Sequence, residues 1–591
     1  MLRWSLRVPK NKPATGLLQS EVFFSPALLL LNFILGFLIY SNTFHAGFHF
    51  DGIGSIRDNP FLGAPYPILK PCAGDNVSRC LTYLTFVFNF RLHGLSLPGY
   101  HLVNLLLHIG TSLLLFEMLR LFFKCPRLTG RLPESSVSFM AWGASLIFLS
   151  HPIQTQAVTY IWQRFAVLAT FFYVLTVALY IKARLSNSAV FYTASVISMV
   201  CALFSKEIAA TLPVMILILE GLFFDRSSSL KKRLLFTAPF SAAILLVPAA
   251  VALSGKLGFY LRPHSYYGYP TAFGADYFLT QLNVVRTYLR LLILPLNQNL
   301  DYDYPITHSL FTFSTLASAF LFLGIFAAAF VMRTRHLLFL WGTLWFFLSL
   351  SIESGFLPIR DVIFEHRLYL PAAGFAAVFS YALILIFKNP RGFIAALLAV
   401  VVIFSVLTYK RNEAWKSEIT IWEDVVKKSP AKARGYARLC LAWKEEKNFS
   451  RAIPFCLKAI ELSPKNAFTY NNLGAMYGEQ KNLIKASENF KKAIGYARKN
   501  RDDRPLLGHS YNNLANVCLM RGQLQKALLF YSKSVDYDLF NPSAHFNRAV
   551  ALLKAGNIEA AKAERGILFQ LGALPLAERL GSLMENAPGN K

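Results

Sequence analysis

Long hydrophobic segments follow one another through the first 410 residues of this chain, and they constrain its fold more than any other feature. A bilayer core about 30 Å thick is crossed by a helix of roughly 20 apolar residues. Eleven segments fit: 24–42, 101–123, 138–150, 162–182, 189–204, 207–224, 234–254, 309–331, 336–352, 368–388 and 392–410. The sequence therefore predicts an all-α polytopic membrane domain over residues 24–410, after a cytoplasmic N-terminus of residues 1–23.

The segment 276–296 is also apolar, but it contains Arg286 and Arg290. An arginine at the bilayer centre costs about 2.5–3.5 kcal/mol on insertion scales, so we predict an interfacial helix here. With eleven spans the short basic loops share one side, which the positive-inside rule makes cytoplasmic. Their bases are Arg3, Arg7, Lys10, Lys12, Lys124, Arg127, Arg131, Lys182, Arg184, Lys231, Lys232, Arg233, Arg333, Arg335, Lys388 and Arg391. The long loops 43–100 and 255–308, the loops 151–161 and 353–367, and everything after residue 410 then lie outside the cytoplasm.

The formal net charge is +28, with a mean hydropathy of +0.41. On a membrane protein such bases belong to cytoplasmic loops near anionic lipid, so we predict membrane lipid as a partner and no nucleic acid. The seven cysteines show no zinc-ligand spacing. Outside the cytoplasm, Cys72 can pair with Cys80 and Cys440 with Cys456. Alternatively, each is a small buried apolar residue.

A 34-residue period marks the last third of the chain. Its spaced small and aromatic residues are typical of tetratricopeptide (TPR) repeats, which stack into an α-solenoid. They are Tyr436, Leu439, Ala452, Ala459 and Pro464 in the first unit, Tyr470, Leu473, Gly474, Tyr477, Ala486, Phe490 and Ala493 in the second, and Tyr511, Leu514, Ala515, Ala527 and Tyr531 in the third. The third follows an insertion at 498–507, and a weaker fourth spans 541–561. We predict a connecting helix over 411–432, a TPR array over 433–575 and a tail over 576–591.

Asparagines recur at matching positions of the first helix in these repeats. They are Asn471, Asn472, Asn512, Asn513 and Asn547. A solenoid presents a concave groove that can bind extended polypeptide, and an asparagine side chain can bind its backbone amides. These residues are therefore candidates for binding an acceptor peptide. The alternative is that they simply fill a solvated face.

Charged residues gather where the predicted spans meet the outer loops, at a depth where charge is costly. One stretch, His49-Phe50-Asp51 with Asp58-Asn59-Pro60, follows the first span. The others are His151-Pro152 through Gln163-Arg164, Ser205-Lys206-Glu207, and Glu365-His366-Arg367-Leu368-Tyr369-Leu370-Pro371. All four fall on the same membrane face in the predicted topology.

Several of these motifs carry a family resemblance when taken in order. The segment "LTYLTF" to Asn89, "GYHLVNLLLH" (residues 99–108), "HPIQTQAV", "SKE" and "EHRLYLP" precede the TPR array. Together with the first-loop acids, they resemble the TPR-containing polytopic glycosyltransferases, bacterial relatives of the eukaryotic transmembrane-TPR O-mannosyltransferases in the GT-C superfamily. This resemblance implies sugar transfer from a polyprenyl-phosphate carrier to an acceptor on the extracytoplasmic side of the bacterial inner membrane. A peptide-binding TPR groove favours a protein acceptor.

The resemblance also implies roles for particular residues. Asp51 matches the first-loop carboxylate that acts on the acceptor; relatives often carry two adjacent acids, whereas Gly52 follows here, which leaves Asp58 as a reserve. An inverting displacement needs such a base and cations for the leaving phosphate. Glu365 is a third acid, able to orient a base or bind the sugar. The candidates for the donor phosphate are Lys206, Arg164, Arg367 and His366.

Plainer interpretations exist for the same residues. Asp51 can be a loop cap, and the cations can form salt bridges such as Lys206 with Glu207 or Glu365 with Arg367. No metal-binding set stands out, and a requirement for a divalent ion stays open. Two other functions also remain: a non-catalytic TPR scaffold for envelope assembly, and a lipid-carrier flippase or glycan polymerase. The outer-face polar clusters argue against the scaffold, and the TPR array is less expected in a flippase.

Overall fold

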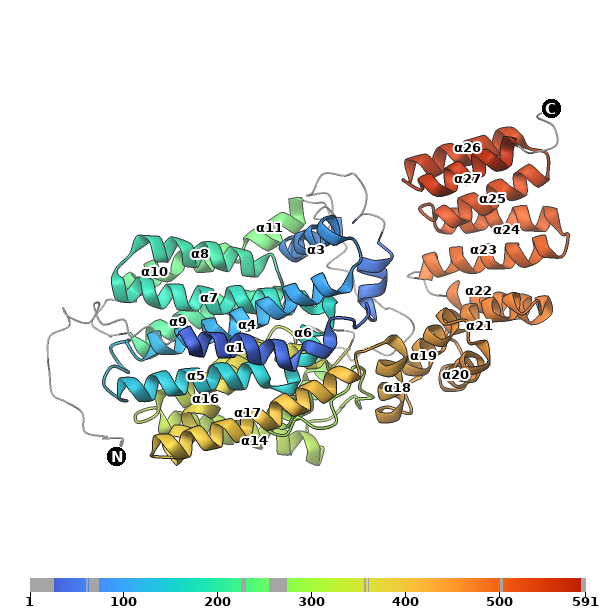
Figure 1. Ribbon diagram of the computed structural model, residues 1–591. Helices are drawn as coiled ribbons and strands as arrows, with labels where there is room; N and C mark the ends of the chain where they lie inside the picture. Colours follow the sequence, from blue (N-terminus) through green and yellow to red (C-terminus); the bar gives the residue numbers. More distant parts are fainter. Residues whose placement is uncertain are drawn as a thin grey trace. The chain divides into compact units, whose positions relative to one another are not determined.

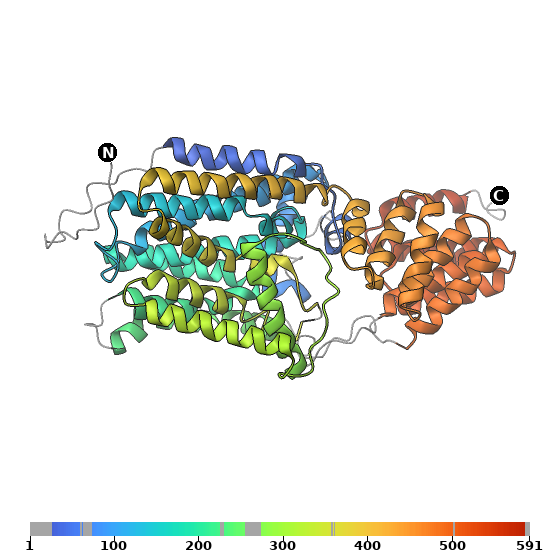
Figure 2. The ribbon, with the colours of Figure 1, turned by 90° about the horizontal axis from the view of Figure 1, so that it is seen from below.

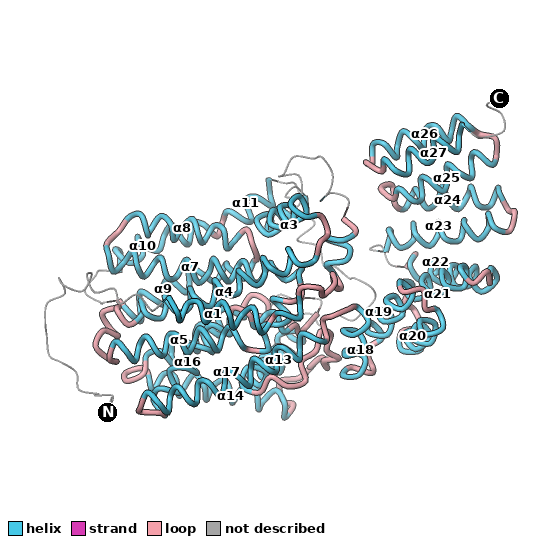
Figure 3. Tube along the Cα trace, viewed as in Figure 1, coloured by secondary structure: helices cyan, strands magenta, loops and turns pink. Residues whose placement is uncertain are grey.

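The computed structural model describes residues 26–59, 62, 74–224, 230–253, 274–355, 358–359, 361–499 and 503–585. Within these ranges every regular element is a helix or a helical turn (Figure 3), which confirms the all-α class. The chain divides into two compact units, one before Trp422 and one from Trp422 onward.

The first unit is a bundle of apolar helices that lie side by side (Figure 1, Figure 2). Its α-helices are α1 (Pro26–Ile39), α3 (Cys80–His93), α4 (Leu97–Phe122), α5 (Glu134–Ser150), α6 (Thr155–Val158), α7 (Arg164–Ser186), α8 (Ala189–Leu203), α9 (Leu212–Phe223), α10 (Leu230–Ala243), α11 (Leu246–Leu253), α13 (Ala275–Ile293), α14 (Phe313–Met332), α15 (Leu337–Leu350), α16 (Pro371–Ile386) and α17 (Pro390–Glu413). Its helical turns are η1 (Ser41–Thr43), η2 (Ile53–Arg57), η4 (Gly74–Arg79), η5 (Pro152–Gln154), η6 (Ile161–Gln163), η7 (Glu207–Thr211) and η8 (Glu365–Leu368).

Helices occupy all eleven segments that were predicted to span a membrane. Five are long and apolar enough to cross a bilayer by length and composition, and a sixth counts if α5 and the bent stretch after it form one span. Helices α14 and α17 expose apolar residues such as Phe320 and Val402, as expected of helices that face lipid. The chain is a multi-pass membrane protein, and eleven remains a predicted number of spans.

Two segments differ in detail from long single helices. The segment 207–224 begins as the turn η7 before α9, and 234–254 is divided into α10 and α11. Helix α10 contains Pro239, which removes one backbone donor from the ladder. The arginine-bearing segment is α13, whose buried residues include Tyr277, Val284 and Leu291, while Arg286 bonds Ser314 at the start of α14. Its predicted interfacial position stays a prediction.

The second unit consists of helix pairs that stack in sequence order (Figure 1). Its helices are α19 (Ala433–Glu445), α20 (Phe449–Leu462), α21 (Ala467–Glu479), α22 (Leu483–Ala497), α23 (Arg504–Met520), α24 (Leu524–Tyr537), α25 (Pro542–Lys554), α26 (Ile558–Gln570) and α27 (Leu574–Glu585). The predicted repeat alanines are buried between paired helices, Ala452, Ala486, Ala527 and Ala561 among them. The TPR solenoid predicted from the period is therefore confirmed.

Three boundaries differ from the sequence expectation. The last apolar helix α17 continues to Glu413, and the connecting helix is α18 (Glu418–Lys428). Helix α23 begins inside the predicted insertion, where Pro505 stands in its first turn and favours a helix start. The predicted tail contains α27, because Ala577, Leu580 and Met584 recur at helical spacing and bury against the last repeat.

Cysteines 440 and 456 form a disulfide that joins α19 to α20, with an S–S distance of 2.06 Å. The predicted bridge within the first repeat is thus present. The other predicted pair, Cys72 with Cys80, lies outside the described residues because Cys72 is not among them.

Candidate functional site

The four predicted polar stretches are linked to one another in the first unit. The backbone N–H of Asp51 donates to the Tyr160 hydroxyl at 2.9 Å, which ties the first loop to the stretch 151–164. The backbone N–H of His366 donates to Gln156 Oε1 at 2.6 Å, which ties that stretch to η8. Lys206 in turn lies close enough to His366 to lower the pKa of its ring. Residues far apart in the sequence therefore build one polar region.

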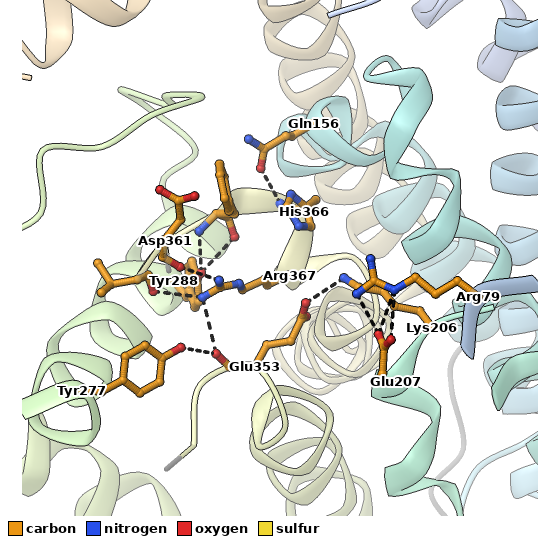
Figure 4. Close-up of polar contacts among 12 residues, drawn as sticks. Arg79, Gln156, Lys206, Glu207, Tyr277, Tyr288, Glu353, Asp361, His366 and Arg367 are labelled. Carbon is orange, nitrogen blue, oxygen red and sulfur yellow. Dashed lines mark hydrogen bonds and ion pairs between the residues drawn. The ribbon is translucent and has the colours of Figure 1, made fainter. Parts of the chain in front are cut away.

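Three cations lie close to His366: Arg79, Lys206 and Arg367 (Figure 4). Arg79 Nη2 lies 2.9 Å from Glu207 Oε2, and Lys206 Nζ lies 2.7 Å from Glu353 Oε1. Lys206 and Glu353 are almost enclosed, whereas Arg79 and Glu207 are each about 40% exposed. We call these three cations, together with Glu207 and Glu353, the cation cluster.

His366 occupies the middle of the cation cluster as a neutral ring. Burial, followed by the nearby charges of Lys206, Arg367 and Arg79, holds the pKa of His366 well below its ordinary value. Its Nδ1 is buried without a hydrogen-bond partner among the described residues, and so is Nε2 of Gln156. Buried polar atoms are nearly always paired in folded proteins. An orphaned Nδ1 near three cations indicates a place for an anionic, hydrogen-bonding ligand.

Arg367 braces the backbone that precedes η8. Its Nη1 donates to the carbonyl of Val362 at 3.0 Å and its Nη2 to that of Asp361 at 2.6 Å, with a longer bond of 3.4 Å to Glu353 (Figure 4). The guanidinium is thus fixed by carbonyl oxygens, and the carboxylates of Glu353 and Asp361 lie near enough to stabilise its charge.

The residues of both salt bridges named as alternatives in the sequence analysis bond to other partners instead. Lys206 has extended backbone angles, φ −162° and ψ 148°, and neighbouring side chains of extended backbone point to opposite sides. Lys206 therefore reaches Glu353 while Glu207 reaches Arg79. Glu365 and Arg367 stand two residues apart on the 3₁₀ turn η8, whose three residues per turn separate their side chains.

Asp51 is exposed on the first loop, and its backbone is held from two sides. Phe50, the residue before it, has a φ of 47° in the left-handed region, and its N–H donates to Glu418 Oε1 at 3.2 Å. The reserve acid Asp58 pairs with the adjacent Arg57 at 2.7 Å on an exposed surface. Asp51 and Asp58 stand on either side of the π-helical turn η2.

Glu365 is fully buried and accepts three hydrogen bonds. They come from Gln298 Nε2 at 3.0 Å, from the Asn299 N–H at 2.5 Å and from the Tyr302 hydroxyl at 2.5 Å. Burial raises the pKa of Glu365, and Arg411 together with these donors opposes the rise. Glu365 therefore anchors the segment 298–302 to η8, which fits the orienting role better than direct contact with a sugar.

Arg164 is completely buried at the start of α7, with its nitrogens committed to neighbouring residues. Nε donates to Asn104 Oδ1 at 2.7 Å, Nη1 to Asn89 Oδ1 at 2.5 Å and Nη2 to the Tyr100 carbonyl at 3.0 Å. Its guanidinium also lies over the Phe86 ring, 4.5 Å from the centroid. Arg164 thus joins α3, α4 and α7, and we assign it this structural role in place of phosphate binding.

The asparagines of the repeats bond to one another across neighbouring helices. Asn513 donates to Asn471 at 3.2 Å and Asn547 to Asn512 at 3.0 Å, so these pairs cross-link α21, α23 and α25. Asn472 accepts from Lys444 Nζ at 3.0 Å, and its own Nδ2 is buried without a described partner. Asn472 and Asn512 are buried, while Asn471, Asn513 and Asn547 are partly exposed. The partly exposed three are the better candidates for peptide contact.

Sequence reasoning missed two members of the cation cluster, Arg79 and Glu353. Arg79 ends η4 in the middle of the predicted first outer loop, and Glu353 lies three residues after α15. Neither belongs to a quoted motif. Within the described ranges, no group of three or more His, Cys, Asp or Glu side chains is arranged to hold a metal ion.

The comparisons with known proteins agree with this architecture. The tetratricopeptide repeat family matches residues 466–538. Protein O-mannosyl-transferase F38B6.6 of Caenorhabditis elegans is 27% identical over 459 residues, which cover 72% of this chain and 62% of that protein. Human protein O-mannosyl-transferase TMTC3 is 24% identical over 474 residues, covering 71% of this chain and 50% of its own. Among solved structures, Pseudomonas aeruginosa pilF is 21% identical with a TM-score of 0.25, covering 30% of this chain and 77% of its own.

The predicted resemblance to repeat-containing transmembrane O-mannosyltransferases is therefore confirmed. The chain spans about half to three fifths of the length of these curated relatives.

Proposed function

We propose that this chain is a membrane glycosyltransferase of the GT-C type. It moves a sugar from a polyprenyl-phosphate carrier to a hydroxyl group of a protein on the extracytoplasmic side of the bacterial inner membrane. The relatives are named protein O-mannosyl-transferases, so mannose is the first sugar to test. The observation that carries the proposal is the cation cluster with the orphaned Nδ1 of His366.

The donor phosphate binds at the cation cluster in this proposal. Lys206 and Arg79 supply charge near His366, Arg367 adds a fixed charge, and neutral His366 contributes one hydrogen bond at Nδ1. Gln156 Nε2 is a second donor that awaits a partner. The carboxylates of Glu207 and Glu353 hold the lysine and arginine in place before the ligand arrives.

Asp51 acts as the general base. Its carboxylate takes the proton of the acceptor hydroxyl while that oxygen forms a bond to the anomeric carbon. The bond from this carbon to the phosphate oxygen breaks, and its electron pair leaves with the polyprenyl phosphate. The cation cluster stabilises this developing charge. The products are a glycosylated protein with inverted anomeric configuration and a polyprenyl phosphate, with the proton on Asp51 returned to water.

The TPR array holds the acceptor protein outside the cytoplasm in this proposal. The disulfide between Cys440 and Cys456 supports this compartment, because disulfides persist in oxidising surroundings such as the periplasm. The partly exposed Asn471, Asn513 and Asn547 are the proposed peptide contacts.

The test is purification under mild extraction, followed by mass spectrometry of bound lipid and a transfer assay with polyprenyl-phosphate mannose. A co-purified prenyl phosphate and label transfer to protein are expected, with weaker donor binding in Lys206→Ala. As a matched control, Lys388→Ala removes an exposed lysine between α16 and α17. Absence of both bound lipid and transfer favours a scaffold, whereas bound lipid without transfer favours a flippase or polymerase.

A further inference from the structure

His49 is completely buried two residues before Asp51, between the first loop and the segment after α17. Its Nδ1 lies 2.9 Å from Glu418 Oε1, and its Nε2 lies 2.6 Å from the carbonyl oxygen of Trp415. The two ring nitrogens of His49 therefore connect the first loop to the Glu418 side chain and to the backbone of Trp415.

Glu418 holds the next residue of the loop as well. The same Oε1 accepts the Phe50 N–H, and Phe50 sits in the left-handed region at a φ of 47°. This region is unfavourable by roughly 1–2 kcal/mol for a residue with a side chain, so a loop in this conformation needs outside support. Glu418 supplies it through two donors on adjacent residues.

Asp51, the residue after Phe50, is held by the same segment indirectly, through Tyr160. Asp51 donates its N–H to the Tyr160 hydroxyl at 2.9 Å, and the Tyr160 ring stacks on Trp415 with centroids 5.6 Å apart. Trp415 is the residue whose carbonyl binds His49. The His49 ring, the Phe50 amide and, through Tyr160, the Asp51 amide are therefore all connected to Trp415 and Glu418.

Neighbouring residues of this segment extend the attachment. Asn412 donates to the Ile39 carbonyl at 3.3 Å and accepts from the Thr159 hydroxyl at 2.8 Å. Glu413 accepts from Asn42 at 2.8 Å. The stretch 412–418 thus bonds both the first loop and the stretch 151–163.

We propose that Glu418, acting through His49 and the Phe50 amide, is a positioning residue that aims the Asp51 carboxylate at the acceptor hydroxyl. This inference rests on the proposed function, in which Asp51 is the base. A reacting group displaced by about 1 Å can lose on the order of 10²-fold in rate. Glu418 touches no reacting atom, so its loss lowers kcat and leaves donor binding intact.

The test compares Glu418→Gln with Glu423→Gln, which removes an exposed carboxylate from the same helix α18. Glutamine keeps the shape but loses the charge of the carboxylate that contacts His49. We expect faster hydrogen exchange at the amides of Phe50 and Asp51 and at least a tenfold lower kcat, with the KM for the lipid donor unchanged. In a double-mutant cycle, adding His49→Gln to Glu418→Gln should cause little further loss, because the two act as one unit.

Several results would overturn the positioning role. They are exchange rates and kcat of Glu418→Gln equal to those of Glu423→Gln, a change in KM alone, or full additivity with His49→Gln. If Glu418→Gln fails to fold, Glu418→Asp is measured instead; it keeps the charge on a shorter side chain, and intermediate exchange is expected. If the wild-type chain transfers no sugar, the proposed function fails, while the exchange measurement still decides whether Glu418 holds the loop.

Discussion

Charged residues at the polar end of the first unit differ in what their hydrogen bonds are used for. Arg164 and Glu365 direct several bonds to neighbouring residues and are completely enclosed. Lys206 and Arg79 each face one carboxylate and lie near His366, whose Nδ1 is orphaned. The first pair holds helices and loops together, and the second pair has the geometry to meet a ligand.

Asp51 gives the sharpest prediction at this scale. Asp51→Asn keeps the size of the side chain and removes the basic oxygen, so turnover should fall by about 10²–10⁴-fold. The affinity for the lipid donor should stay unchanged, since the cation cluster is intact. Transfer rate and donor binding are measured in parallel on one preparation.

Asp58→Asn is the matched control because its carboxylate lies in the same loop, paired with Arg57. Full activity in Asp51→Asn together with loss in Asp58→Asn would assign the base to Asp58. Loss only in a Glu365 variant would assign it to Glu365.

The neutral His366 predicts a pH dependence of stability. Its pKa is held well below the ordinary value of about 6.5, so below about pH 6.5 the unfolded chain binds a proton that the folded chain does not. Stability therefore falls as the pH falls, by at most about 1.4 kcal/mol per pH unit from this residue. His366→Gln should lose less stability than the wild type between about pH 7 and pH 5, as measured by thermal unfolding in detergent. Parallel curves for the two chains would contradict the neutral ring.

The type and order of the residues predicted most members of the candidate site. They did not predict which members hold the structure together and which are placed to bind a ligand. Lys206, His366 and Arg367 were predicted together because their motifs stand at outer span ends. Arg164 belongs to a motif at a predicted outer span end as well, yet its nitrogens donate hydrogen bonds to residues of α3 and α4. Which partner a buried cation finds depends on packing between segments that are 60–75 residues apart in the chain. A local sequence pattern cannot indicate contacts between segments so far apart in the chain.

At the scale of single elements, small residues set how closely the repeat helices approach. A Cβ atom on Gly474 would lie 2.8 Å from Phe490 and 3.2 Å from the Ala486 carbonyl oxygen. On the same helix, a Cβ atom on Gly478 would meet nothing closer than Ala486 at 3.9 Å. The consensus glycine is therefore required for contact between α21 and α22, and the second glycine is not.

Gly474→Ala should destabilise the array by about 1–3 kcal/mol relative to Gly478→Ala, because both gain the same helix propensity and only one clashes. Circular dichroism melting of a fragment of residues 411–591 measures the difference. Equal melting temperatures would mean that the repeat register is wrong.

The disulfide between α19 and α20 provides a second prediction at this scale. It closes a loop with a sequence separation of 16, and a loop of this size corresponds to about 3 kcal/mol in the chain-entropy account. Replacing Cys440 and Cys456 by serine should lower the melting temperature of the fragment. Cys518→Ser, at a buried free thiol of the same array, is the control. Alkylation of Cys440 and Cys456 in the unfolded, unreduced chain would rule out the bridge.

For the whole molecule, periodic signals predicted the fold well. Runs of apolar residues placed all eleven predicted segments on helices, and the 34-residue period placed the repeats. Helix α27 was not predicted, because it follows the last consensus position of the repeats and is recognisable only by the face that it buries. The hydrogen bonds from 412–418 to the first loop were not predicted either, because local composition does not indicate which distant segments will pair.

The predicted topology determines on which side of the membrane the last residues of the chain lie. Eleven spans that start from a basic cytoplasmic N-terminus end outside, so a C-terminal alkaline phosphatase fusion should be active and a fluorescent protein that folds only in the cytoplasm should be dark. Fusions after Lys182, in a predicted cytoplasmic loop, should give the opposite pattern. A C-terminal reporter active only in the cytoplasm would refute the arrangement.

The pairing of His49 with Glu418 also has a consequence for biosynthesis. These residues are 369 positions apart, and at a synthesis rate of about 5–20 residues per second the first loop waits roughly 20–70 s for its partner. During that time the loop that bears Asp51 lacks the carboxylate that holds His49 and Phe50. A ribosome that stops before the last apolar helix is finished therefore releases a chain that is inserted but not assembled. The site is completed only after Glu418 has been made.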